Sequence, residues 1–144
     1  MIAKRKPVSE GSLAKHAADV ALAGRFDGLL AEARAAEDAL RSAQADGAST
    51  ADLRLLGKRL DEALTAVMRA AFAAERAEIG PRGYEDRIYR RKAMATSPVR
   101  AWTMEAQRLL TLRESHRLTG IVKLPPRLED VPDPTTSPAS TVTA

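Results

Sequence analysis

The chain has 144 residues, a formal net charge of +4 and no cysteine. This length suits one ordinary domain, and the lack of cysteine excludes disulfides, thiolate metal sites and a cysteine nucleophile. Hydrophobic residues make up 44% of the chain but aromatic residues only 3%, and much of the apolar content is alanine. Alanine packs helices closely without filling a thick core, so the composition predicts an all-α protein of slender helices.

The first residues, MIAKRKP, lack the apolar run of a signal peptide. No apolar segment is long enough to cross a bilayer. We therefore expect a soluble protein of the cytoplasm, which would be the host cell's cytoplasm if the protein is viral.

The positive charge is local. Residues 1–81 carry 12 basic and 12 acidic side chains, residues 82–127 carry 11 basic and 4 acidic ones, and residues 128–144 carry 3 acidic side chains and no basic one. A concentrated basic region attracts polyanions, whereas a diffuse excess of charge mainly affects solubility.

Residues 1–11 are predicted to form a flexible basic arm, with Ser12 as the N-cap of the first helix. Two heptad patterns follow, separated by DGAST at 46–50, and each spaces its apolar residues by three and four. The first runs through Leu22, Phe26, Leu29, Ala33, Ala36, Leu40 and Ala43, and the second through Leu53, Leu56, Leu60, Ala63, Val67, Ala70, Ala74 and Ala77.

Residues 12–78 are therefore predicted to form a long antiparallel helical hairpin, coiled-coil-like, with arms of about 30 residues. Gly24 and Gly28 weaken the first arm or allow a close backbone approach. Two alanine-rich seams bury little surface, so we expect both a covering third helix and self-association into a homo-oligomer.

IGPRG at 79–83 breaks the helical pattern. Residues 84–95 are predicted to form a short helix with Ile88 and Met94 as its apolar positions. A C-terminal helix then begins at Ser97-Pro98 and ends at Gly120. The short helix and this C-terminal helix together form a basic region over 79–120. Residues 121–144 are rich in Pro, Ser and Thr and are predicted to form an extended or disordered tail, in which IVKL could add a strand to a neighbour.

Scarce aromatic residues and dense positive charge coincide in YEDRIYRRKAMATSPVRAW at 84–102. On a helix, Arg87, Arg90 and Arg91 share one face, and the guanidinium fork suits phosphate. Tyr89 and Trp102 would hold this helix against the hairpin. The alternative is that these arginines pair with Asp61, Glu62, Glu75 and Glu78. The predicted nucleic-acid-binding residues are Lys4, Arg5, Lys6, Arg87, Arg90, Arg91, Lys92 and Arg100.

No catalytic, metal or cofactor site is predicted. His16 and His116 are isolated in the sequence and are interpreted as structural or solvated. No nucleophile has an assignable base, and no phosphate-loop, dinucleotide or zinc-protease motif occurs. The chain is not expected to be an enzyme.

Residues 100–127, RAWTMEAQRLLTLRESHRLTGIVKLPPR, resemble the region after the central hairpin in small terminase subunits of tailed bacteriophages. There a Leu- and Arg-rich helix ends in a run of the type RxxLxG followed by proline, and Arg117, Leu118, Gly120 and Pro125 fit that run loosely. The resemblance implies an oligomeric, non-enzymatic protein that binds viral DNA and passes it to a motor subunit. A helix-turn-helix usual in that family has no room before residue 12.

The sequence thus favours an oligomeric nucleic-acid-binding protein, with DNA ahead of RNA and viral DNA packaging as the implied setting. The alternatives are a phage structural, scaffold or adaptor protein that docks a motor or capsid partner through its tail, and a small helical subunit whose arginines neutralise RNA.

Overall fold

The computed structural model describes residues 6–119, and over that range the chain is helical with no strand, which confirms the all-α class. The elements are α1 (Glu10–Ala23), α2 (Phe26–Ala45), α3 (Thr50–Ile79), the 3₁₀ helix η1 (Pro81–Tyr84), α4 (Arg87–Met94) and α5 (Ser97–Leu118). The predicted strand at 121–124, the helix end at Gly120 and the Pro-rich tail lie outside the described residues.

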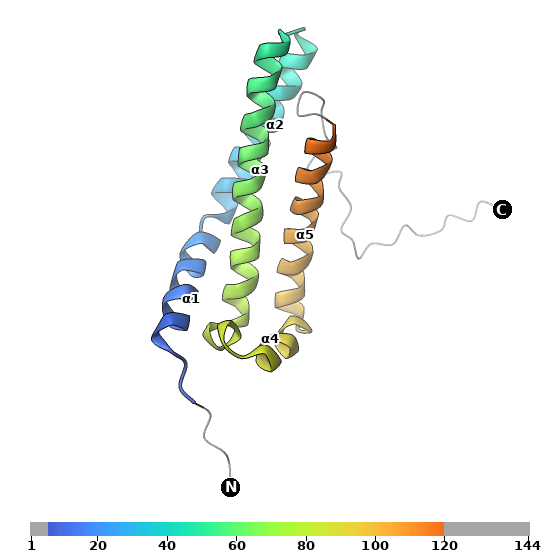
Figure 1. Cartoon of the computed structure of the whole chain (residues 1–144). Helices are drawn as coiled ribbons and strands as arrows, with labels where there is room; N and C mark the ends of the chain where they lie inside the picture. Colours follow the sequence, from blue (N-terminus) through green and yellow to red (C-terminus); the bar gives the residue numbers. More distant parts are fainter. Residues whose placement is uncertain (1–5, 120–144) are drawn as a thin grey trace, which may run out of the picture.

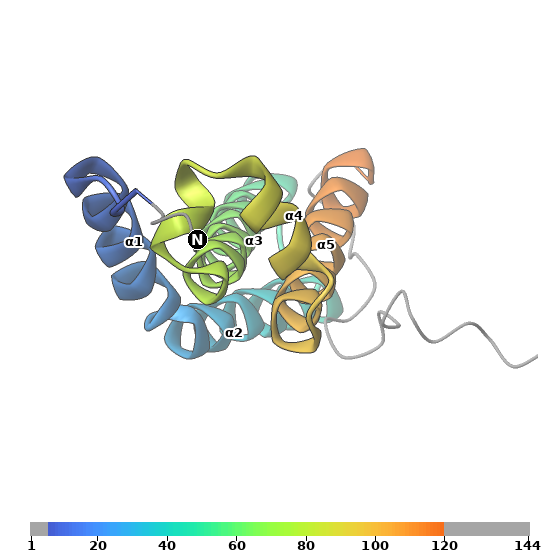
Figure 2. The same cartoon turned by 90° about the horizontal axis from the view of Figure 1, so that it is seen from below.

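Helix α3 is the centre of the fold, and α1, α2 and α5 all pack against it (Figure 1). Its 30 residues extend over about 45 Å. Helix α2 runs antiparallel to the first part of α3, α1 lies beside its last part, and α5 follows most of its length (Figure 1). Seen along the bundle, α1 and α5 flank α3 on opposite sides and α4 crosses the lower end (Figure 2).

The predicted apolar positions supply most of the core. Phe26, Leu29, Ala33 and Leu40 of α2 are buried, and they belong to one hydrophobic cluster with buried residues of α3 and α5. The members from these two helices are Leu60, Leu64, Val67, Met68, Ala70, Ala71, Ala106, Leu109 and Leu112. Helix α5 therefore covers α3 as expected. A coiled-coil seam between α2 and α3 stays a prediction.

The first arm of the expected hairpin is divided into two helices. Gly24 and Arg25 separate α1 from α2, and the Arg25 amide reaches back only three residues, to the carbonyl of Leu22. Glycine costs more conformational entropy in a helix than alanine, so the break falls at Gly24 and not inside an alanine run. Gly28, in contrast, lies within α2.

Helix starts were predicted to within a few residues. Of Ser49 and Thr50, the two capping residues in DGAST, Ser49 caps α3, and its hydroxyl accepts a hydrogen bond from the Asp52 amide. The prediction of Ser12 as the first cap is wrong, since α1 begins at Glu10 and Ser9 caps it. Thr96, one residue before the expected Ser97, occupies the N-cap of α5.

The turn between α3 and α4 depends on glycine. Gly80 has a φ of 99°, a left-handed value that side chains disfavour. Gly83 is buried, and a Cβ there would collide with the side chain of Ile79. The IGPRG sequence thus lets η1 fold back tightly on the end of α3.

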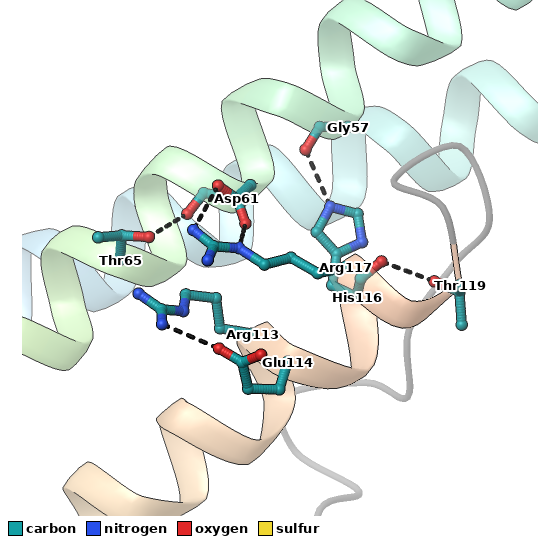
Figure 3. Close-up of polar contacts among 8 residues, drawn as sticks. All are labelled: Gly57, Asp61, Thr65, Arg113, Glu114, His116, Arg117 and Thr119. Atoms are coloured by element: carbon teal, nitrogen blue, oxygen red, sulfur yellow. Dashed lines mark hydrogen bonds and ion pairs between the residues drawn. The ribbon is translucent and has the colours of Figure 1, made fainter.

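The end of α5 is joined to α3 by polar contacts (Figure 3). His116 is fully buried, and its Nε2 lies 2.9 Å from the carbonyl oxygen of Gly57. Arg117 donates to both carboxylate oxygens of Asp61, at 2.7 and 3.2 Å. The interpretation of His116 as structural agrees with this position.

Candidate nucleic-acid interface

Helix α4 is short and entirely on the surface. Asp86 caps it by accepting a hydrogen bond from the Tyr89 amide at 2.9 Å. None of its residues is buried, and the exposed fractions of Ile88 and Met94 are 70% and 38%. The predicted short helix is present, but its two apolar positions face solvent and not the core.

An open concavity lies against α4, and six of its thirteen lining residues are basic. We call these six residues the α4 basic surface: Lys6, Arg82, Arg87, Arg90, Arg91 and Lys92. The acidic residues in the same lining are Glu85 and Asp86. The predicted row of three arginines therefore lies in one place, joined by Lys6 from the N-terminal segment and by Arg82 from η1.

The charges of this surface are not neutralised by ion pairs within residues 6–119. Arg82 donates to the Lys6 carbonyl oxygen at 3.1 Å, and Arg90 donates to that of Gly83 at 3.2 Å. Carbonyl acceptors orient a guanidinium group without removing its charge. The exposed side chains of Arg87, Arg91 and Lys92 form no hydrogen bond or ion pair with a described residue.

The two carboxylates of the lining are already engaged. Glu85 accepts hydrogen bonds from the Ser9 hydroxyl at 2.7 Å, from the Ser12 hydroxyl at 2.9 Å and from the Ser9 amide at 3.1 Å. The Ser9 and Ser12 hydrogen bonds, chiefly, lower the pKa of Glu85 below its usual value. Asp86 is engaged as the cap of α4. Both groups hold backbone in place beside the basic residues.

The acidic residues considered as alternative partners lie elsewhere. Asp61 pairs with Arg117, and Glu75 accepts a hydrogen bond from Thr103 at 2.6 Å. Glu62 and Glu78 are exposed and form no ion pair within the described range. The arginines of α4 are therefore not structural partners of α3 carboxylates.

The aromatic residues of the stretch have separate positions. Tyr89 is half-buried and lines the concavity. Trp102 is on α5, and its ring meets that of Phe26 edge-on with centroids 5.1 Å apart. Trp102 thus anchors α5 against α2, and its part in holding α4 stays a prediction.

A polar network that the sequence did not reveal fixes α1 beside this surface. Arg76 donates to both carboxylate oxygens of Asp19, at 2.8 and 3.0 Å, and the Tyr84 hydroxyl donates to the same carboxylate. His16 meets the Tyr84 ring edge-on, and its Nε2 lies 3.1 Å from the Ala77 carbonyl oxygen. Tyr84 and Asp19 are 65 positions apart, and the other pairs of the network are also distant in the sequence, so no local signal predicted them.

The remaining predicted residues divide into two groups. Arg100 is exposed near the start of α5 but does not line the concavity. Lys4 and Arg5 precede the described residues.

Within residues 6–119, no group of three or more His, Asp or Glu side chains is arranged to hold a metal ion. No helix in that range combines the length and apolar character needed to cross a membrane. Compared with known proteins, the chain matches no family model, no curated protein and no solved structure.

Proposed function

We propose that this protein binds nucleic acid, DNA in preference to RNA, through the α4 basic surface and without strong sequence specificity. The observation that carries the proposal is the gathering of six basic side chains around one concavity, where their charges are not neutralised by ion pairs with described residues. Such a surface attracts phosphate oxygens and releases condensed counterions from the polyanion.

The chemistry of the surface favours phosphate over bases. Four of its six residues are arginines, whose planar fork bonds two phosphate oxygens at once. Arg82 and Arg90 are held by backbone carbonyls, so little side-chain freedom is lost when they bind. Phosphate contacts position a protein on a duplex but carry no direct sequence information, which is the reason for proposing non-specific binding.

The proposal includes self-association. Leu13 and Val20 are each 49% exposed and lie seven residues apart on the outer side of α1, so they share one helical face. The resemblance to small terminase subunits adds viral DNA packaging as the proposed setting. An assembling structural, scaffold or adaptor protein is the second candidate, and the exposed apolar side chains of α1 favour it.

Fluorescence anisotropy with a labelled duplex tests the binding proposal. Arg87→Glu with Arg91→Glu reverses two charges that have no partner among the described residues. We expect at least a tenfold loss of affinity on every duplex sequence, because two phosphate contacts become repulsions. The melting temperature should stay near the wild-type value, since neither side chain is buried.

The matched control is Arg34→Glu with Arg59→Glu. These two exposed arginines lie on α2 and α3, outside the concavity, and the net charge changes by the same amount. We expect a much smaller loss of affinity than in the α4 variant. Equal losses of affinity in both variants would show that binding depends on the overall charge of the protein and not on the α4 basic surface. If the wild-type protein does not bind the duplex, the assembly function is the better supported of the two candidates.

A further inference from the structure

The same sequence contains a segment whose charge complements the α4 basic surface. Residues 128–144 include Glu129, Asp130 and Asp133 and no basic residue. The α4 basic surface has six cationic side chains against the two carboxylates of Glu85 and Asp86, which are already engaged. An excess of positive charge therefore faces solvent on a chain that also carries a compact run of negative charge.

The apolar residues of the two segments are complementary as well. Ile88 and Met94 line the concavity, and they are 70% and 38% exposed. In LEDVPD, at 128–133, the apolar residues Val131 and Pro132 lie between Asp130 and Asp133. A segment of this pattern supplies apolar contacts for Ile88 and Met94 and carboxylates for the surrounding arginines.

The chain is long enough for this contact to form within one molecule. Helix α5 ends at Leu118, and its 22 residues separate that end from the α4 end of the bundle by about 33 Å. An extended chain covers about 3.3 Å per residue, so the path from Thr119 spans about 36 Å to Asp130 and about 46 Å to Asp133. The same path spans only about 30 Å to Leu128 and about 33 Å to Glu129, so Leu128 falls short of the surface and Glu129 comes no further than its edge. Asp130 and Asp133 reach the α4 basic surface only when the connecting residues are nearly extended, and the prolines at 125 and 126 favour extension.

We propose that residues 130–133 of the same chain dock on the α4 basic surface and compete there with polyanions. The competition rests on the proposed function, whereas the docking does not. The contact is electrostatic and exposed, so it weakens as salt rises. Bound nucleic acid and the docked acidic segment exclude each other, so the segment lowers the apparent affinity of the surface for non-specific nucleic acid.

Amide spectra of the full-length, ¹⁵N-labelled protein test the docking directly. The tail variant is Glu129→Gln, Asp130→Asn and Asp133→Asn, and the control is Asp27→Asn, Glu32→Gln and Asp38→Asn on the exposed side of α2. The tail variant should shift the amides of residues 87–92, and 0.5 M NaCl should produce the same shifts in the wild type. The control should leave these amides unchanged.

Duplex affinity, measured on the same proteins at low salt, tests the competition. Two exposed ion pairs of about twofold each, from Asp130 and Asp133, imply roughly fourfold tighter binding by the tail variant than by the control. Unchanged amides at 87–92 would overturn the docking whether or not DNA binds. Shifts that disappear on dilution would assign the contact to a neighbouring molecule and overturn docking within one chain. Shifted amides without any duplex binding would leave the docking intact and refute only the proposed function.

Discussion

Asp19 shows how one side chain fixes the position of a whole helix. Its carboxylate receives two hydrogen bonds from Arg76 on α3 and one from Tyr84 on η1. Partial burial raises the pKa of Asp19, but the hydrogen bonds from Arg76 and Tyr84 and the charge of Arg76 outweigh it and lower that pKa. The network ties α1 to the end of the bundle that carries the α4 basic surface.

The lowered pKa of Asp19 predicts a pH-dependent contribution to stability. A carboxyl whose folded pKa is depressed stabilises the fold above its unfolded pKa of about 4, and the contribution is lost as pH falls through the folded pKa. Asp19→Asn should reduce the free energy of unfolding at pH 7 by about 1–2 kcal/mol, and the difference should shrink below pH 4. Urea unfolding at several pH values measures this. If the difference in unfolding free energy between Asp19→Asn and the wild type does not vary with pH, the charge of Asp19 does not stabilise the fold. Asp38→Asn, at an exposed position, is the control.

Gly83 and Gly28 predict opposite responses to the same substitution. A methyl group at Gly83 collides with Ile79, so Gly83→Ala should destabilise the fold by about 1–3 kcal/mol. Gly28 lies inside α2 with no atom of another group within 4 Å of an added Cβ, and Gly28→Ala should stabilise by about 0.5–1 kcal/mol. Thermal unfolding of both variants measures the two effects. If Gly83→Ala is as stable as the wild type, the Ile79 side chain or the turn moves aside at little cost, and the predicted destabilisation is wrong.

At the scale of elements, the residues of α3 that its neighbouring helices cover contribute most of the stability that α3 gives the fold. Leu60 is fully buried in the core, whereas Leu55 of the same helix is 50% exposed. Leu60→Ala should cost about 2–5 kcal/mol, and Leu55→Ala should cost less than 1 kcal/mol. Chemical denaturation of both variants compares the positions. Similar losses would mean that Leu55 is also covered, as it would be at an interface between copies of the chain.

Periodic apolar spacing predicted the elements well because helix packing depends on it. The spacing placed Phe26, Leu29, Ala33 and Leu40 on one face, and all four are buried. The sequence did not predict that α1 ends at Ala23, because Gly24 and Gly28 weaken a helix alike and the spacing does not say which of them interrupts it. It did not predict how Trp102 packs, because that depends on contact with the distant Phe26. For the candidate interface, clustered charge indicated the arginines of α4, but the role of Arg82 follows only from the turn that brings η1 beside Lys6.

At the scale of the molecule, the proposed self-association has a direct consequence in solution. The chain has a mass of 15.5 kDa, and light scattering at micromolar concentration should report a multiple of it. Leu13→Glu with Val20→Glu places charges on the exposed apolar face of α1 and should reduce the mass toward that of one chain. A wild-type protein that is monomeric after nuclease treatment would refute self-association without affecting the binding proposal.

The most direct test of the central claim is the salt dependence of duplex binding by the wild-type protein. Each phosphate contact contributes a slope of about −0.9 in a plot of log affinity against log salt. Engagement of three to five side chains of the α4 basic surface predicts a slope of roughly −2.7 to −4.5. The slope should be equal for duplexes of unrelated sequence and shallower for Arg87→Glu with Arg91→Glu. A slope near zero, or one that the double substitution leaves unchanged, would contradict the assignment of nucleic-acid binding to this surface.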